Sequence, residues 1–297
     1  MKIEAPGKDS MEMPLFSGRK LPMRGTLVMG ILNVTNDSFY AHSRAADEHD
    51  AVSRALSMNE AGADVLDIGA ESTRPGSRGI DPETECDVLT PVIRAIRREL
   101  PAMPISADTR HARTAAAALE AGADIVNDVS GLELPDEAPD MMSLLSKTGA
   151  AYVLMHTKGT PDAMQRSPFY GDVISEIRTF FGEHIRALES AGVSRDKLII
   201  DPGIGFGKRV SDNLALLANI EKFYSFGIPV LMGASRKGFI GSVAGGTAKN
   251  DPAERLEGTL AITSLCAIKG VNIVRVHDVA ANRRTVDMIE TIVRHRL

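Results

Sequence analysis

The sequence predicts a single α/β domain folded as a (β/α)8 TIM barrel with a short N-terminal extension. Three observations lead to this fold. Short apolar runs alternate with helical segments about eight times along the chain, which is the number of units in such a barrel. The runs are apolar on both faces, as parallel strands covered on both sides should be. Nearly every run is followed by polar side chains, as expected where barrel strands reach a catalytic mouth. A doubly wound open sheet remains the alternative.

The expected elements follow one another without a linker or low-complexity tract. The strands are apolar and end at a polar or small residue; they are expected at residues 26–32, 64–68, 104–108, 124–128, 151–155, 198–201, 228–232 and 272–276. The helices separate them, and several are followed by a glycine suited to a C-cap. They are expected at residues 47–61, 81–100, 111–121, 139–148, 172–191, 212–223, 253–269 and 280–294. We therefore expect one barrel domain over residues 25–297, preceded by an extension over 1–24 that is a candidate hairpin.

Composition and charge narrow the functional classes. The chain has 297 residues, 43% of them hydrophobic and 25% charged, which is ordinary for a soluble globular protein. Its net charge of −5 gives no general attraction to nucleic acid or to an anionic membrane. The absence of Trp and the small number of other aromatic residues argue against binding of single-stranded nucleic acid by base stacking. Cys86 and Cys266 lack metal-ligand spacing, and no apolar run is long enough to span a bilayer. We expect a reduced, cytoplasmic protein with small-molecule substrates.

The segment 228–241 organises the candidate site. An apolar strand stops abruptly and is followed by Ser235, Arg236 and Lys237, after which a short helical turn begins. Two adjacent cations at the end of a buried strand are costly to desolvate unless an anion or polar ligand meets them. A solvated loop is the simpler interpretation for this pair alone. The other strand ends favour a shared ligand site, because they carry the same kind of side chain.

The polar residues at the strand ends together predict one polar cup at one mouth of the barrel. They are Asn33, residues 71–74, Asp108, Asn127, Asp128, His156, Asp201, residues 235–237 and residues 275–277. A carboxylate can accept two parallel N–H bonds from a flat heterocycle with a guanidine-like edge. Arg275, His277 and Asn33 suit an anionic leaving group. The cup is therefore expected to hold a polar ring at its floor and a phosphate-type group at its rim.

Several features leave alternatives open. The segments 35–44 and 72–81 are long for strand-to-helix connections and are candidate lids. The Gly-rich segment 201–208 is either a tight turn or a loop that approaches a ligand. His156 either caps its strand or takes part in catalysis. Asp64 and Asp67 are interpreted as barrel or capping residues, and both cysteines as packing residues within helices.

These blocks, in their order along the chain, resemble the dihydropteroate synthase family over residues 30–278. The matching motifs are residues 30–35 with 37–39, residues 71–76, Asp108 with Thr109, Asn127 with Asp128, residues 155–156 with 159–161, residues 201–208, residues 235–237 and residues 275–278. Each is weak alone, but the set is highly specific. The first loop departs from the family's usual pattern, because residues 36–43 lack its glycine pair.

The resemblance implies a homodimeric barrel that condenses 4-aminobenzoate with (7,8-dihydropterin-6-yl)methyl diphosphate and releases pyrophosphate with the help of Mg²⁺. By resemblance, the pterin is bound by Asp108, Asn127, Asp201, Lys237 and Arg275. The diphosphate is held by Asn33, Arg275 and His277, with Asn33 near the metal. The 4-aminobenzoate is surrounded by Thr73, Arg74, Pro75, Phe206 and Ser235. The catalytic set is Asp108, Lys237, Arg275 and His277.

The chemistry of these residue types agrees with an SN1-like reaction. Loss of pyrophosphate leaves a delocalised cation that Asp108 can stabilise electrostatically, while Arg275 and His277 stabilise the leaving group. The weakly basic aromatic amine then attacks without a strong base. Two other functions share this pattern of residues. A pterin-dependent methyltransferase with a corrinoid partner has the same barrel, although the motifs at 73–75 and 235–237 argue against it. A non-enzymatic pterin binder is suggested only by the altered first loop.

Overall fold

The strands form a closed parallel barrel. The structure, a computed structural model, describes residues 11–34, 41–70, 80–159 and 168–295, and the described side chains of the first helix begin at Glu48. Eight parallel strands are hydrogen-bonded in the order β8-β7-β6-β5-β4-β3-β10-β9. A parallel bridge between Ile200 and Val230 joins β8 to the entrance of β9, and Ile200 N donates to Pro229 O at 2.9 Å. This closure confirms the predicted barrel and excludes the open sheet.

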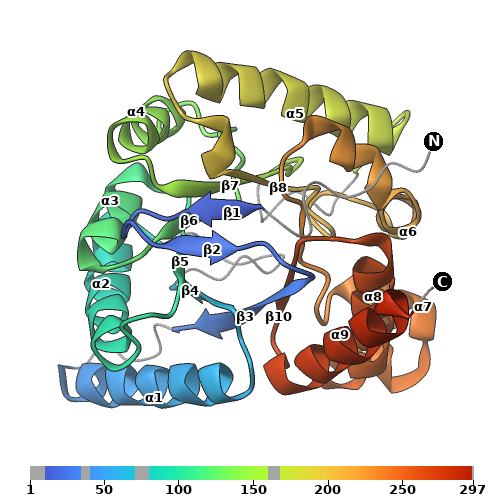
Figure 1. Ribbon diagram of the computed structural model, residues 1–297, viewed down its shortest axis with the longest axis horizontal. Coiled ribbons are helices and arrows are strands. Elements are labelled where there is room, and N and C mark those ends of the chain that lie inside the picture. The colour runs from blue at the N-terminus through green and yellow to red at the C-terminus, as the bar shows by residue number, and fades with distance from the viewer. Residues whose placement is uncertain (1–10, 35–40, 71–79, 160–167, 296–297) are drawn as a thin grey trace.

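The elements alternate regularly along the described chain. The barrel strands are β3 (Leu27–Asn33), β4 (Val65–Gly69), β5 (Ile105–Asp108), β6 (Ile125–Asp128), β7 (Ala151–Met155), β8 (Leu198–Asp201), β9 (Leu231–Met232) and β10 (Ile273–Val276). The helices are α1 (Ala41–Glu60), α2 (Pro82–Glu99), α3 (Ala112–Ala121), α4 (Ala138–Thr148), α5 (Val173–Ser190), α6 (Val210–Ala218), α7 (Gly238–Ala244), α8 (Leu256–Lys269) and α9 (Val279–Arg294). They surround the sheet on its outer side (Figure 1). None of the described helices is long and apolar enough to cross a membrane.

The helix boundaries follow from local chemistry. Asp81 and Asp172 cap the N-termini of α2 and α5, where their carboxylates accept hydrogen bonds from backbone N–H groups of the first turn. The C-caps of α3 and α8 are Gly122 and Gly270, which adopt left-handed backbone conformations that suit glycine. Both cysteines lie in helices, as expected, with Cys266 buried and Cys86 half-buried.

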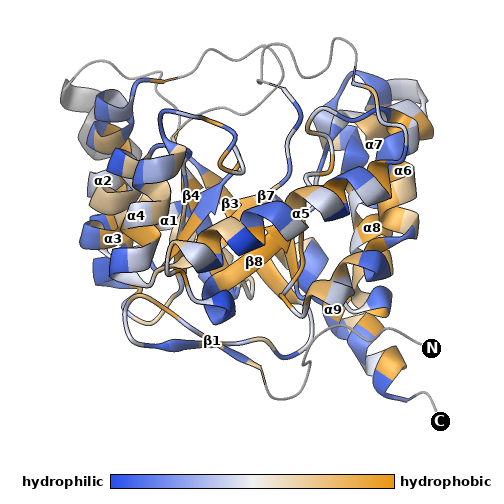
Figure 2. Cartoon of the chain, turned by 90° about the horizontal axis from the view of Figure 1, so that it is seen from above, coloured by the Kyte–Doolittle hydropathy of each residue, from blue (hydrophilic) through white to orange (hydrophobic). Residues whose placement is uncertain are grey.

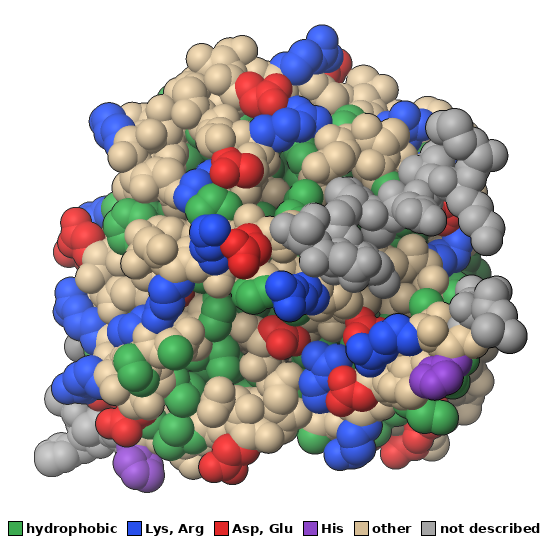
Figure 3. Space-filling model, viewed as in Figure 1, with side chains coloured by type: hydrophobic (Ala, Val, Ile, Leu, Met, Phe, Trp, Pro, Cys, Tyr) green, Lys and Arg blue, Asp and Glu red, His purple; other side chains and the backbone are tan. Residues whose placement is uncertain are grey.

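A hairpin plugs one end of the barrel. Strands β1 (Glu12–Pro14) and β2 (Lys20–Pro22) pair antiparallel and cross that end (Figures 1 and 2). The outer face of this end carries interspersed acidic and basic side chains (Figure 3). The hairpin's apolar side chains are buried with the barrel interior in one cluster: Met13, Leu15, Leu21, Met23, Leu27, Met29, Val65, Ile125, Ala151, Val153, Ile199, Leu231 and Ile273. The closed end is therefore filled with apolar side chains and leaves the opposite mouth for polar chemistry.

The two-residue period of the strands places the polar site directly above this apolar layer. Side chains two apart on a strand point to the same face. Interior apolar residues are followed two positions later by polar ones: Val65 by Asp67, Ile125 by Asn127, Ile199 by Asp201 and Ile273 by Arg275. The intervening residues pack outward against the helices in a separate core cluster. The alternation thus brings four polar side chains from distant segments into one interior layer.

Candidate active site

The register of neighbouring strands aligns the polar strand ends at one mouth. Asn33 pairs with Gly69, Gly69 with Asp108, and Asp108 with Asn127 across four consecutive strands. Gly69 leaves room for Asp108, because a Cβ at position 69 would lie 3.1 Å from the Cβ of Asp108 and would require that side chain to shift. On the other side of the barrel, Met155 pairs with Asp201. The sequence-predicted site residues on these strands therefore share one end of the barrel.

Arg275 lies at the centre of the site between two carboxylates. Its Nε donates to Asp67 Oδ2 and its Nη2 to Asp108 Oδ2, each at 2.5 Å. Burial lowers the pKa of this guanidinium. The charges of Asp67 and Asp108 together raise the pKa by more than burial lowers it, so the net shift is upward. Arg275 therefore stays charged, and it brings β4, β5 and β10 together.

Asp67 is a site residue that the sequence analysis missed. It is fully buried, and Asn127 Nδ2 donates to its Oδ2 at 3.1 Å, so one oxygen joins Asn127 to Arg275. This bond uses one N–H of Nδ2, so Oδ1 and the second N–H of the Asn127 amide are left for a ligand. Asp67 was interpreted as a barrel or capping residue; it is on a barrel strand, but it belongs to the polar layer. Its spacing of two from the interior Val65 was the signal available in the sequence.

Asp201 and Lys237 form the second half of the site. Asp201 is buried at the end of β8, and its Oδ1 accepts a hydrogen bond from Gly203 N at 2.8 Å. Burial raises the pKa of this carboxyl, while Lys237, Lys208 and Arg275 act in the opposite direction. Lys237 Nζ donates to Ile204 O and lies 4.3 Å from the centre of the Phe206 ring. Burial lowers the pKa of Lys237 to about 7, against the charge of Asp201.

A turn between β9 and α7 connects the site to the end of β10. Ser235 Oγ lies 3.0 Å from His277 Nδ1 and accepts a hydrogen bond from His277 N at 3.2 Å. Arg236 has a positive φ of 58°, which is unusual for a residue with a side chain. Its guanidinium makes two hydrogen bonds to Asp278, at 2.8 and 2.6 Å. The turn thus places the side chain of Ser235 against His277 and that of Lys237 near Asp201.

His156 is not placed to act as an acid or base. It is buried after β7, and burial and then the nearby Lys208 lower its pKa to about 2. Its Nδ1 lies 3.0 Å from Lys208 Nζ, and its ring packs edge-on against Phe180 with centroids 4.9 Å apart. Of the two interpretations left open for His156, the structure favours a structural one.

Part of the predicted site falls outside the described residues, and Asn33 lies at its edge. Thr73, Arg74, Pro75 and most of the unusual first loop fall outside the described residues. Asn33 is exposed at the end of β3. Among the residues that the structure describes, no group of three or more His, Cys, Asp or Glu side chains could hold a metal ion.

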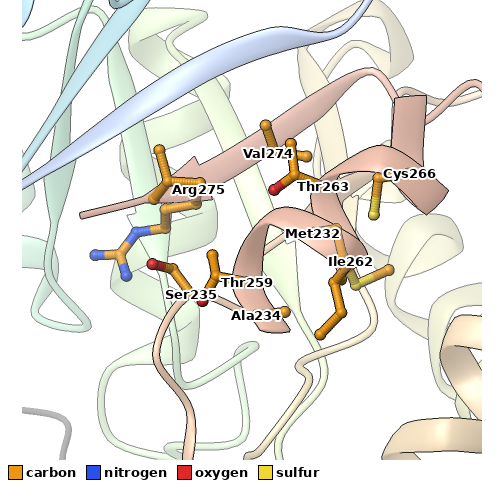
Figure 4. Close-up of a pocket in the computed structure, with 10 residues that line it drawn as sticks. Met232, Ala234, Ser235, Thr259, Ile262, Thr263, Cys266, Val274 and Arg275 are labelled. Carbon is orange, nitrogen blue, oxygen red and sulfur yellow. The ribbon is translucent and has the colours of Figure 1, made fainter. Parts of the chain in front are cut away.

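A small cavity of about 10 Å³ lies behind the site, between β9, β10 and α8. Its wall includes Ser235, Thr259, Cys266 and Arg275, and it has room for about one water. In Figure 4, the hydroxyl of Ser235 points to the side on which the Arg275 guanidinium lies, whereas Cys266 lies on the far side of the cavity. Ser235 and Arg275 therefore line the boundary between the core and the site.

Comparison with known proteins gives one consistent result. The family described as "Pterin binding enzyme" matches residues 29–277. The chain is similar to dihydropteroate synthase of Escherichia coli (strain K12), with 39% identity over 279 residues, 94% of this chain and 96% of the relative. The crystal structure of Yersinia pestis dihydropteroate synthase with a sulfonamide drug has a TM-score of 0.87 at 35% identity, covering 96% of this chain and all of that one. Dihydropteroate synthase from Xanthomonas albilineans in complex with 7,8-dihydropteroate has a TM-score of 0.82 at 35% identity, with the same coverage.

Proposed function

The chain belongs to the dihydropteroate synthase family of pterin binding enzymes, and from this membership we propose how its site performs the family's reaction. The enzyme is a transferase that condenses (7,8-dihydropterin-6-yl)methyl diphosphate with 4-aminobenzoate to give 7,8-dihydropteroate and pyrophosphate, a step of folate biosynthesis. The family resemblance found in the sequence is thereby confirmed.

The observation that carries the proposal is the interior polar layer. Asp67, Asp108, Asn127, Asp201 and Arg275 come from five strands, and Lys237 reaches the same layer from the turn after β9. Asp201 accepts the amino-pyrimidine edge of the pterin, because an ionised carboxylate can take two parallel N–H bonds. Asn127 presents Oδ1 to a ring N–H, and Lys237 donates to a ring acceptor. The layer therefore matches a flat bicyclic ring with donors on one edge and acceptors on another.

The reaction follows from the charges around this ring. The bond between the pterin methylene carbon and the diphosphate oxygen breaks, and its electron pair leaves with pyrophosphate. The cation left behind is delocalised over the pterin, and Asp108 stabilises it through fixed negative charge in a buried site. The lone pair of the aromatic amine then forms the new C–N bond, and the amine releases its extra proton to solvent. Lys237 holds the pterin ring and Arg275 holds the leaving group, so the ring stays in one position during both the loss of pyrophosphate and the attack of the amine.

The rim of the site suits the diphosphate. Arg275, His277 and Asn33 lie at neighbouring strand ends, and the first of these carries a permanent charge. Mg²⁺ is commonly bound by one or two protein groups together with waters and substrate phosphates, so Asn33 and the substrate's own oxygens form a fitting donor set. When bound, the ion supplies positive charge that favours departure of pyrophosphate.

The 4-aminobenzoate site is proposed beside this rim. Phe206 in the β8–α6 loop lies against the Lys237 ammonium, and Ser235, in the same β9–α7 turn as Lys237, lies against His277. Thr73, Arg74 and Pro75 complete the set by resemblance. The aromatic ring of Phe206 provides a face on which a flat benzoate can pack. By resemblance, Arg74 is the partner of the benzoate carboxylate.

We further propose a cytoplasmic homodimer. Four of the exposed large apolar side chains lie on three consecutive helices: Val210 and Leu214 on α6, Val243 on α7 and Ile268 on α8. A second copy that covers this face would remove them from water. The two cysteines, neither in a disulfide, suit a reducing compartment. Sedimentation velocity tests the dimer: a Val243→Glu variant should shift it toward monomers, whereas an unchanged dimer would place the contact elsewhere.

The activity is tested by measuring pyrophosphate release. The proposal predicts that dihydropteroate forms only when pterin diphosphate, 4-aminobenzoate and Mg²⁺ are all present, with at least one pyrophosphate released per dihydropteroate. Lys237→Ala and Asp201→Asn should each lose most of this activity while retaining the fold. Absence of dihydropteroate when all three are present, or methyltetrahydrofolate binding without any condensation, would contradict the proposed reaction.

A further inference from the structure

Lys208 is a buried cation that the proposed reaction leaves without a role. Its side chain is almost fully buried, at 3% exposure, in the loop between β8 and α6. Its Nζ contacts three acceptors: His156 Nδ1 at 3.0 Å, His156 O at 3.2 Å and Phe206 O at 3.0 Å. Three acceptors match the three N–H bonds of an ammonium. Burial lowers the pKa of Lys208 well below its usual range against the charge of Asp201, so the three contacts offset only part of the cost of burying the ammonium.

His156 completes this arrangement as an acceptor when its proton lies on Nε2. Because burial and Lys208 hold its pKa near 2, the imidazole is neutral at any working pH. Its Nδ1 can then accept from Lys208, while its carbonyl accepts a second N–H of the same ammonium. The end of β7 is thus joined to the β8–α6 loop through one side chain.

The backbone of this loop lies directly against the end of β7. Gly203 and Gly207 both have positive φ, of 69° and 58°. A Cβ at Gly203 would collide with the carbonyl oxygen of His156, and a Cβ at Gly207 with that of Lys158. Such close approach requires glycine, and Lys208 is the polar anchor between the two segments.

The anchored loop is the one that holds the pterin-facing groups. Gly203 N donates to Asp201, Ile204 O accepts from Lys237, and the Phe206 ring lies under the Lys237 ammonium. Lys208 bonds the carbonyl of Phe206 itself. Movement of the loop would therefore displace the support of both Asp201 and Lys237 together.

We propose that Lys208 is a positioning residue of the pterin site, which ties the end of β7 to the β8–α6 loop and so fixes Asp201 and Lys237 for ring recognition. The inference rests on the proposed function, because it assigns Lys208 to the binding of that substrate. Lys208 acts through the loop and is not expected to touch the pterin. The charge of Lys208 also lowers the pKa of Asp201, as the charges of Lys237 and Arg275 do, and so favours the ionised carboxylate.

The test is calorimetric titration with a pterin that lacks the diphosphate, which reports ring recognition without turnover. Lys208→Met should weaken its binding by about tenfold or more, because the loop loses its anchor and Asp201 and Lys237 lose their preorganised geometry. The matched control is Lys269→Met. Lys269 also joins two segments, through Ala218 O and Glu221 at 2.7 Å each, but it lies between α8 and the segment after α6, away from the site. This control should lower the melting temperature and leave pterin affinity unchanged.

The titrations are made well below the melting temperature of each variant, so that loss of fold and loss of positioning are separated. A purely structural role would lower the melting temperature of Lys208→Met but leave its pterin affinity within about twofold of wild type, and that result would overturn the inference. If Lys208→Met does not fold, His156→Phe supplies the test. It keeps the ammonium and removes one acceptor, so affinity should fall by about three- to tenfold. Wild-type affinity in His156→Phe would then reject the role. Failure of the wild-type enzyme to bind the pterin would instead reject the proposed function.

Discussion

Replacement of Asp67 by Asn tests the interior polar layer most sharply, because it removes one charge and almost no volume. In the wild-type enzyme, two carboxylates share one guanidinium, so Asp67, Arg275 and Asp108 together carry a net charge of −1. The Asn variant reduces that charge to zero. A unit charge about 7 Å from a developing cation is worth about 2 kcal/mol at an effective dielectric constant of about 20. We therefore expect kcat to fall by roughly 30-fold.

The same change affects stability in a way that can be separated from catalysis. Removing one partner of a buried ion pair costs about 3–5 kcal/mol, but Arg275 keeps Asp108 and the new amide keeps an acceptor oxygen, so a loss of about 2 kcal/mol is expected. The control is Asp64→Asn. Asp64 pairs with Arg283 at 3.1 Å and accepts from Val28 N at 2.7 Å, just before the start of the same strand.

Steady-state kinetics with both substrates saturating, together with thermal melts, distinguish the two variants. Asp67→Asn should lose both stability and kcat, whereas Asp64→Asn should lose stability alone. The reasoning would be refuted by Asp67→Asn turnover within about threefold of wild type in a folded protein, since the assumed charge effect would then be absent.

Other predictions concern the charged turn and the rim. Because the pKa of Lys237 is about 7, its ammonium is lost as pH rises, and kcat/KM for pterin diphosphate should fall above pH 7; Lys237→Arg should remove that limb from the pH profile, and an unchanged limb would assign it to another group. Asp278→Asn replaces one of the two acceptor oxygens of Arg236 by an amide N–H and removes the ion pair, so kcat/KM should fall by about tenfold as the strained turn relaxes, and wild-type kinetics would show that the turn needs no such support. Ser235→Ala removes the hydrogen bond to His277 and should raise the KM for 4-aminobenzoate by about three- to tenfold. A change confined to the KM for pterin diphosphate would contradict the assignment of Ser235 to the 4-aminobenzoate site.

The order and type of the main elements could be predicted from sequence because their signals are local. The strands at 151–155 and 198–201 were predicted with the boundaries that the structure has, since apolar runs and polar endings mark them. The segment expected as one helix over 212–223 is instead α6 followed by a 3-10 stretch, Ile220–Phe226. The α-helix ends at the C-cap Asn219, a residue that favours helix ends and was not used as a stop signal.

The partners within the site could be predicted only in part, because they depend on register across the barrel. The hydrogen bond between Arg275 and Asp67 joins residues 208 positions apart. The residue types at strand ends identified Asp108, Asn127, Asp201, Lys237 and Arg275. Asp67 lies within its strand, one pleat further from the mouth than Asp108. A single aspartate inside an apolar run gives no sign of a binding role in the sequence, because its polar partners come from other strands. The contact between Lys208 and His156, 52 positions apart, likewise depends on how the backbone places the two loops.

The central claim is that the interior polar layer recognises a pterin through the Asp201 carboxylate. Calorimetric titration of wild type and Asp201→Asn with a pterin that lacks the diphosphate measures this directly. Asn can still accept from Gly203 N, but its amide group opposes the donors of the ring edge. One pterin should bind per wild-type chain, and the variant should bind at least about tenfold more weakly, because hydrogen bonds to a charged group are worth about 1.5–3 kcal/mol. Equal affinity in the two proteins would contradict the account.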